Sequence, residues 1–122
     1  MNWWITASGG LAAVSAAGHA FAGRTMFLQP IRARLADPLH AAVFTGMWHF
    51  ITVHFVLSAL FLLTCGYFGR SDLAVALVAT QFAAYAAINL LLSLRLGHAL
   101  RLAQWLLFAG VAILAGLGLA VP

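Results

Sequence analysis

The sequence predicts an all-α integral membrane protein, a bundle of four transmembrane helices with both termini on the outer side of the membrane. Hydrophobic residues make up 65% of the 122 residues and charged residues only 7%, and the mean hydropathy is +1.04. A soluble domain of this size does not need so much apolar surface. The apolar residues also fall into stretches of roughly 20 residues, the length that crosses a bilayer as a helix.

The first predicted helix covers about residues 3–22. It is rich in glycine, alanine and serine, which allow helix backbones to approach closely in lipid, so we expect Gly10 and Gly18 to pack against another helix. Pro30 is expected to end this helix, because proline lacks the backbone donor that a helix interior requires. The second predicted helix, residues 40–67, is rich in aromatic residues.

The third and fourth predicted helices cover about residues 73–94 and 103–121. All of these stretches are continuously apolar rather than alternating, which favours helices over strands. Helices and closed barrels are the only structures that satisfy every backbone polar group inside a bilayer. The sequence therefore predicts one transmembrane domain over residues 1–122.

The arginines predict the orientation of these helices. Only Arg70, which is balanced by Asp72, follows the second helix, and the other basic residues flank the opposite ends of the helices: Arg24, Arg32, Arg34, Arg95 and Arg101. The positive-inside rule assigns that side to the cytoplasm. Both termini then face out, and Trp3 and Trp4 lie at the outer interface, which indole rings favour. We expect a multi-pass protein of a bacterial inner (cytoplasmic) membrane.

The composition also argues against several function classes. The basic residues are scattered between apolar stretches instead of forming the basic face of a soluble fold, so no nucleic-acid partner is expected. Cys65 is the only cysteine, which leaves no intrachain disulfide. The sequence has no phosphate-binding glycine loop and no GxSxG or HExxH motif. Whether the protein is an enzyme is left open.

Histidines inside the predicted helices are the main candidates for a functional site. An ionisable side chain deep in a bilayer costs at least a few kcal/mol unless it is neutral or paired, so such a residue indicates function by default. His19 shares a stripe of the first helix with Ser8 and Ser15, and His49 shares one of the second helix with Thr52. Because the first two helices are antiparallel neighbours, His19 and His49 are expected to face each other.

The remaining polar side chains extend this pattern. His54 points to a different face of the second helix, about 140° from His49. On the third helix, Gln81, Tyr85 and Asn89 form a stripe at four-residue steps, and Asn89 is expected to meet His19 and His49 in the cytoplasmic half of the bundle. The two remaining histidines are expected at the surface: His40 and His98.

This arrangement predicts a redox-linked membrane protein with a cofactor between the first two helices. His19 and His49 are suitable axial ligands for haem b, or hydrogen-bond partners for a quinone, with Tyr85, Asn89 and Thr52 in the same pocket. The cofactor is left open between haem b and quinone. A metal ion bound by His19 and His49 is a third reading, although zinc and copper prefer three or four ligands.

A different class of function fits the same residues. Each histidine can be a neutral group that bonds to a serine, threonine or asparagine of a neighbouring helix as part of the packing. The protein would then be a non-catalytic accessory or assembly subunit of a larger membrane complex, or a homo-oligomer, with the polar stripes as its contact surface. In both readings the lipid bilayer is the surrounding partner.

The first half of the chain carries a GHxxxGR…WHxxT pattern, in Gly18–Arg24 and Trp48–Thr52, with Gln29 and Pro30 between them. In these residues it resembles small four-span bacterial membrane proteins to which no function is attached. The resemblance implies a four-helix membrane fold with histidines on the first two helices. It implies no activity.

Overall fold

The computed structural model describes residues 1–69, 71–97 and 103–121, and these residues are almost entirely helical, without a strand. The all-α prediction is therefore confirmed over this part of the chain. The elements in chain order are α1 (Trp3–Gly18), η1 (His19–Leu28), α2 (Gln29–Arg34), α3 (Pro38–Phe68), α4 (Asp72–Arg95) and α5 (Gln104–Ala120). The last three begin and end within two residues of the helices predicted at 40–67, 73–94 and 103–121.

The first three elements form one uninterrupted helical run. η1 is a π-helix, in which each backbone N–H bonds to the carbonyl five residues earlier. The expectation that Pro30 ends this helix was wrong, because Pro30 lies at the start of α2, where a missing backbone donor is tolerated. The helical run ends only at Leu35, whose backbone is extended (φ −82°, ψ 111°).

Two helices, α3 and α4, are long and apolar enough to cross a membrane. α3 has 31 residues and α4 has 24, whereas the apolar helix α5 has 17. At 1.5 Å per residue, α3 is about 46 Å long, which exceeds the roughly 30 Å hydrocarbon core of a bilayer. The side chain of Asp37 caps the start of α3 by accepting a hydrogen bond from the Leu39 N–H at 2.8 Å.

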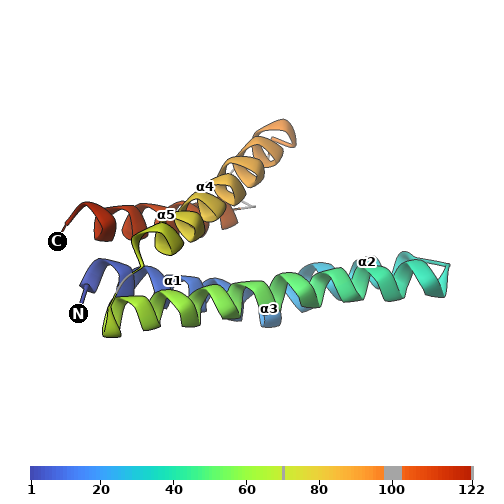
Figure 1. Ribbon diagram of the computed structural model, residues 1–122. Coiled ribbons are helices and arrows are strands. Elements are labelled where there is room, and N and C mark those ends of the chain that lie inside the picture. The colour runs from blue at the N-terminus through green and yellow to red at the C-terminus, as the bar shows by residue number, and fades with distance from the viewer. Residues whose placement is uncertain (70, 98–102, 122) are drawn as a thin grey trace.

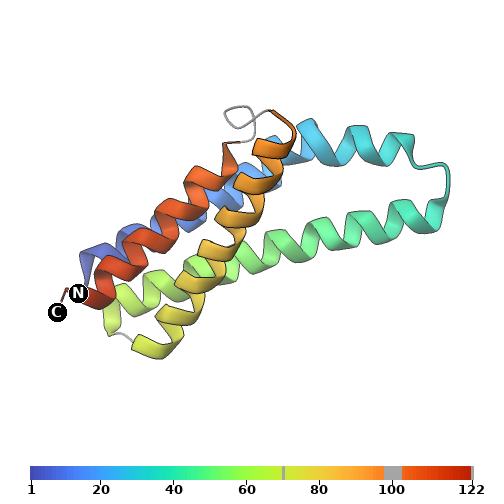
Figure 2. The ribbon, with the colours of Figure 1, turned by 90° about the horizontal axis from the view of Figure 1, so that it is seen from above.

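The helices form a bundle that is tight at one end and open at the other (Figure 1). α1 runs beside both α3 and α5, and α4 packs on α5 while it diverges from α3. Both termini lie at the tight end, near the turn between α3 and α4. η1, α2 and the first half of α3 extend beyond α5 as a hairpin (Figure 2).

The core of the bundle receives side chains from all four of its helices. The most deeply buried apolar residues are Ile5 and Ala12 of α1, Leu62 of α3, Val75 and Phe82 of α4, and Val111 and Ala115 of α5, none of which has exposed surface. All of them lie in the region where α1, α3, α4 and α5 overlap, so the core is at the tight end. The projecting hairpin is mostly exposed.

Glycines set the close contact between α1 and α3. A Cβ atom built on Gly9 would lie 2.8 Å from the backbone nitrogen of Leu63. A Cβ atom on Gly66 would lie 2.6 Å from the backbone nitrogen of Thr6. Because backbone atoms cannot rotate away as a side chain can, these two positions exclude any larger residue at the present helix spacing.

Two other glycines, Gly10 and Gly18, were expected from the sequence to pack against another helix. Both Gly10 and Gly18 face open space, with no atom within 4 Å of a built Cβ, so the expectation that they pack against another helix was wrong. Successive residues of a helix point about 100° apart. Gly9 therefore takes the inward position and turns Gly10 away from α3.

Two polar side chains join the termini to the bundle. The Asn2 backbone N–H donates to the Gly66 carbonyl at 2.7 Å, and its side-chain amide donates to the Gly118 carbonyl at 2.8 Å. Six residues further along the chain, the buried Ser8 hydroxyl of α1 donates to the Val111 carbonyl of α5 at 2.8 Å. These bonds hold the ends of α3 and α5 against the start of α1.

Candidate functional site

A cavity of about 440 Å³ lies between α3 and α4, where these two helices diverge. Residues of η1, α3, α4 and α5 line it: His19, Phe50, Ile51, His54, Phe55, Tyr85, Asn89, Gln104 and Phe108. It therefore combines two histidines, a tyrosine and two amides with an aromatic wall. This is the composition of a small-molecule site, which is mostly apolar with a few placed polar groups.

His19 is the first residue of η1, and its ring lies flat against the indole of Trp48. The ring centroids are 4.0 Å apart and the planes differ by 14°. The His19 Nε2 atom is 3.3 Å from the Trp48 carbonyl oxygen. A carbonyl oxygen can only accept, so Nε2 carries the proton in this bond, and Nδ1 of the neutral ring is an acceptor.

Gly23 makes room for the indole of Trp48. A Cβ atom at residue 23 would lie 2.8 Å from Cζ2 of Trp48, which is closer than real Cβ atoms approach a carbon. The Trp48 carbonyl also accepts a hydrogen bond from the Thr52 hydroxyl at 3.0 Å. The position of His19 therefore depends on Gly23 and Thr52 through Trp48.

His54 connects α3 to the polar stripe of α4. Its Nε2 atom is 3.4 Å from the hydroxyl of the buried Ser58. Its ring meets the edge of Tyr85 at a centroid distance of 5.9 Å. His54 therefore stands between the polar and aromatic parts of the cavity wall.

An aromatic cluster of Phe55, Phe82, Tyr85 and Phe108 forms one side of the site. The centroids of all its ring pairs lie 5.3 to 6.2 Å apart, within the range that attractive aromatic pairs adopt. The cluster joins α3, α4 and α5, and its three phenylalanines are buried. Its rings are tilted against one another, and three of them, Phe55, Tyr85 and Phe108, supply an apolar wall of the cavity.

The stripe of α4 is organised around Tyr85. The Gln81 side-chain amide donates to the Tyr85 hydroxyl at 2.8 Å, and the Asn89 side-chain amide donates to the Tyr85 carbonyl at 2.9 Å. The hydroxyl proton of Tyr85 is therefore left for a partner in the cavity, and the side-chain oxygen of Asn89 is left as an acceptor. The predicted stripe is one continuous hydrogen-bonded unit within α4.

A smaller cavity of about 190 Å³ adjoins the first one. The two share His19, Phe55, Gln104 and Phe108 in their linings. From these residues the smaller cavity continues between η1 and α5, along the side chains of Met26, Phe27 and Leu107. The site is thus a polar and aromatic chamber followed by a narrower space with apolar side chains.

Three of the five predicted site residues line the cavity between α3 and α4: His19, Tyr85 and Asn89. Thr52 lies behind the site, where it bonds to the Trp48 carbonyl. The structure does not bring His49 to the cavity, and its side chain is exposed. Trp48 occupies the position on α3 that faces η1, and the next residue is turned away by about 100°.

The second histidine of the cavity is His54, which sequence reasoning placed on another face of the helix and left outside the site. The residues that share a helix face with His54 do indicate that this face points into the protein. His54 shares its face with Ser58 and Cys65, and both of these are buried. Gln104 and Phe108 were also missed, because nothing in the sequence shows which turn of α5 lies next to α3.

The structure also bears on the predicted metal site and on the histidines that were expected at the surface. Within residues 1–69, 71–97 and 103–121, no group of three or more His, Cys, Asp or Glu side chains could hold a metal ion. His40 lies at the surface as expected, where it is 3.4 Å from the carboxylate of Asp37. Three residues of the sequence-based predictions lie outside the described residues: Arg70, His98 and Arg101.

Comparisons with protein-family models, with curated proteins and with solved structures found no match to this chain. The resemblance of its first half to small four-span bacterial proteins stays a prediction. Function is therefore argued from the site alone.

Proposed function

We propose that the chain is a four-pass protein of a bacterial inner membrane with both termini outside. Besides α3 and α4, the run from α1 through η1 is helical over residues 3–28, and its α-helical part, the 16 residues of α1, is alone about 24 Å long at 1.5 Å per residue. α5 would cross with its 17 apolar residues. Arg24, Arg32 and Arg34 are exposed on the part of the hairpin remote from the termini, which supports a cytoplasmic location for that end.

We propose further that the cavity between α3 and α4 binds a lipid-soluble aromatic ligand of the quinone class. The observation that carries this proposal is the pairing of the aromatic cluster with polar side chains on one wall. A flat ring would pack against the phenylalanine rings of Phe55 and Phe108, which are tilted by 52° to each other, while the Tyr85 hydroxyl and a histidine would bond to its oxygens. Redox-linked quinone binding is the function that this chemistry fits best.

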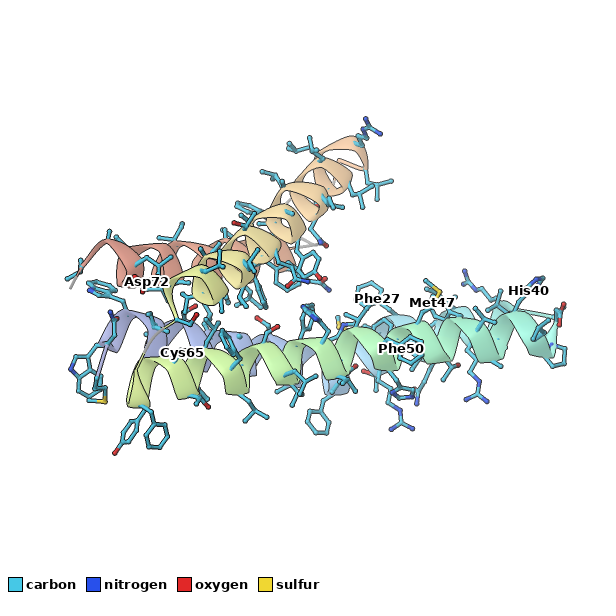
Figure 3. The ribbon with its side chains drawn as sticks, viewed as in Figure 1. Phe27, His40, Met47, Phe50, Cys65 and Asp72 are labelled. Atoms are coloured by element: carbon cyan, nitrogen blue, oxygen red, sulfur yellow. The ribbon has the colours of Figure 1, made fainter. Side chains whose placement is uncertain are left out.

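The mouth of the cavity favours a ligand that arrives from lipid. Phe50 and Ile51 line the cavity and are 74% and 44% exposed, so its entrance is apolar. Figure 3 labels Phe50 and Met47 on α3 and Phe27 on the helical run in front of it in the sequence. The adjoining cavity along Met26 and Leu107 would hold the beginning of an aliphatic tail.

The same geometry argues for a quinone over haem b. Bis-histidine ligation needs two imidazoles that address one iron from opposite sides. His49 is exposed, and the Nε2 atoms of His19 and His54 lie at the Trp48 carbonyl and the Ser58 hydroxyl. Ligation of haem iron through these Nε2 atoms would break both contacts, whereas a quinone would use the Tyr85 hydroxyl and the His54 ring as donors.

A binding titration tests the proposed site. Duroquinone is added to the purified full-length protein in detergent, and binding is followed through quenching of tryptophan fluorescence, because Trp48 lies directly behind His19. Saturable binding is expected, with affinity at least tenfold weaker in a His54→Phe variant. A His49→Phe variant serves as the matched control, and its affinity should equal that of the parent. Absence of saturable binding, or equal loss in both variants, would contradict the site.

The projecting hairpin supports an accessory-subunit role as the second candidate function. Large apolar side chains are exposed on it, including Phe21 at 77% and Met47 at 56%, and α4 and α5 do not cover this end of the bundle (Figures 1 and 3). A photoreactive amino acid at residue 47 in native membranes tests this role. A single cross-linked partner protein would support it, and labelling of lipid alone would contradict it.

A further inference from the structure

The hydrogen bonds around the cavity determine which atoms remain for a ligand. The Nε2–H of His19 is used by the Trp48 carbonyl at 3.3 Å, so the ring offers Nδ1 as an acceptor. The side-chain amide nitrogen of Asn89 donates a hydrogen bond to the Tyr85 carbonyl at 2.9 Å, so Asn89 offers its side-chain oxygen to a ligand as an acceptor. Two of the polar groups that line the cavity therefore offer acceptors.

The remaining groups supply donors. The Tyr85 hydroxyl accepts from Gln81 at 2.8 Å and keeps its own proton for another partner. The His54 ring contacts the Ser58 hydroxyl, and because both groups can donate or accept, His54 can present either role to a ligand. Gln104, the second amide of the lining, can likewise donate or accept, so one lining group is a donor and two are adaptable.

The two redox forms of a quinone-class ligand differ in how well their own donors and acceptors match those of the cavity lining. A quinone carries only carbonyl acceptors, so it would bond to Tyr85 and His54 and leave the acceptors of His19 and Asn89 without a donor. A hydroquinone carries two O–H donors, which can bond to these acceptors. An acceptor that loses water and gains no donor is costly, so the oxidised form is the poorer match.

Resting on the quinone-class site proposed above, we infer that the cavity selects the reduced, dihydroxy form of its ligand, with His19 and Asn89 as the specificity-determining residues. Trp48 is a positioning residue in this arrangement, because its carbonyl fixes the proton of His19 on Nε2 and its indole holds the ring in place. Gly23 contributes by leaving space for that indole.

The inference is tested by isothermal titration calorimetry of the full-length protein in detergent, under strictly anaerobic conditions. Three related probes are compared: duroquinone, durohydroquinone, and the dimethyl ether of durohydroquinone, which is larger by two methyl groups. Each hydrogen bond to a neutral group contributes roughly a two- to tenfold change in affinity. Durohydroquinone is therefore expected to bind about tenfold more tightly than duroquinone, and the ether, which has no O–H donor, should lose this advantage.

Variants assign the selectivity to individual groups. Asn89→Leu and His19→Phe each remove an acceptor and should lower the ratio of hydroquinone to quinone affinity at least twofold. Tyr85→Phe removes a donor and should raise that ratio, because it weakens the quinone more. The ratio is insensitive to a uniform loss of folded protein, and Asn89→Leu keeps the test valid if His19→Phe does not fold.

The outcomes separate this inference from the function on which it rests. Equal affinity for the two redox forms, or tighter binding of duroquinone, would overturn the selection while leaving a quinone-class site in place. An unchanged ratio in both acceptor variants would overturn the assignment to His19 and Asn89. Failure of all three probes to bind would remove the proposed site and the inference together.

Discussion

His19 and Trp48 form one unit, in which the imidazole stacks on the indole at 4.0 Å and bonds to the carbonyl of the same tryptophan at 3.3 Å. The unit joins η1 to α3 at the point where the bundle opens into the cavity. It fixes the ring of His19, its proton and its distance from Phe55, which is 5.5 Å between centroids. The geometry of the site therefore depends on the stacking and on the hydrogen bond between these two residues.

Gly23→Ala is expected to destabilise the protein by about 1–3 kcal/mol, the usual cost of overpacking. The new Cβ atom would lie 2.8 Å from Cζ2 of Trp48, so the indole must move and take His19 with it. Thermal unfolding in detergent measures the loss of stability. The variant should also bind duroquinone more weakly, because the cavity wall shifts.

Gly18→Ala is the matched control for this substitution. It lies five residues earlier in the same helical run, and a built Cβ finds no atom within 4 Å. Because alanine favours helix over glycine by roughly 0.5–1 kcal/mol, this variant should be at least as stable as the parent. Similar destabilisation of both variants would show that Gly23 is not a specific contact of Trp48.

The fold could be predicted from the sequence to the extent that it depends on local apolar patterns. The bounds of α3, α4 and α5 follow from where long apolar stretches begin and end. The continuation of the first helix through Pro30 could not be predicted in this way, because it depends on the wider hydrogen-bond pattern of η1. A π-helix has no residue pattern that distinguishes it from an α-helix.

Of the predicted site residues, Tyr85 and Asn89 line the cavity together with His19, whereas the second histidine in its lining is His54 and not His49. Tyr85 and Asn89 are aligned by the spacing within one helix, which the sequence gives directly. The choice between His49 and His54 depends on the rotation of α3 against η1, which the Trp48 contact with Gly23 determines. Such contacts between helices leave no mark on the periodicity of a chain that is apolar on all sides.

Close packing of α1 on α3 makes Gly9→Ala and Gly66→Ala destabilising, each by about 1–3 kcal/mol. In both cases the added methyl group would meet backbone atoms of the facing helix, which can be relieved only by separating the helices. Gly10→Ala adds the same methyl group one residue away, on an open face. If Gly10→Ala reduces the unfolding temperature as much as Gly9→Ala does, this helix contact is not as we describe.

Ser8→Ala should reduce stability by about 0.5–2 kcal/mol, because its hydroxyl is buried and bonds to the Val111 carbonyl of α5 at 2.8 Å. Ser15→Ala is the comparison, since the Ser15 hydroxyl bonds within its own helix, to the Leu11 carbonyl. The Ser15→Ala variant should lose less stability than the Ser8→Ala variant. Equal stability of the two, measured by thermal unfolding, would mean that the bond between α1 and α5 contributes nothing specific.

The proposed topology is tested with reporter fusions. A reporter that is active only in the periplasm should give a signal when it is fused to the C-terminus. The same reporter inserted after Ala36, between α2 and α3 near the exposed Arg32 and Arg34, should be silent. The reverse pattern would overturn the orientation and place the projecting hairpin outside the cell.

Photoaffinity labelling tests the quinone-class site most directly. An azido-quinone is irradiated with the purified protein, and the labelled residues are identified by mass spectrometry with and without excess duroquinone. We expect label that duroquinone displaces on Phe50–Phe55 of α3 and on Tyr85–Asn89 of α4, the segments that line the cavity. Label confined to the aromatic residues near the termini, such as Trp3 and Tyr67, or label that excess duroquinone does not displace, would contradict the proposed site.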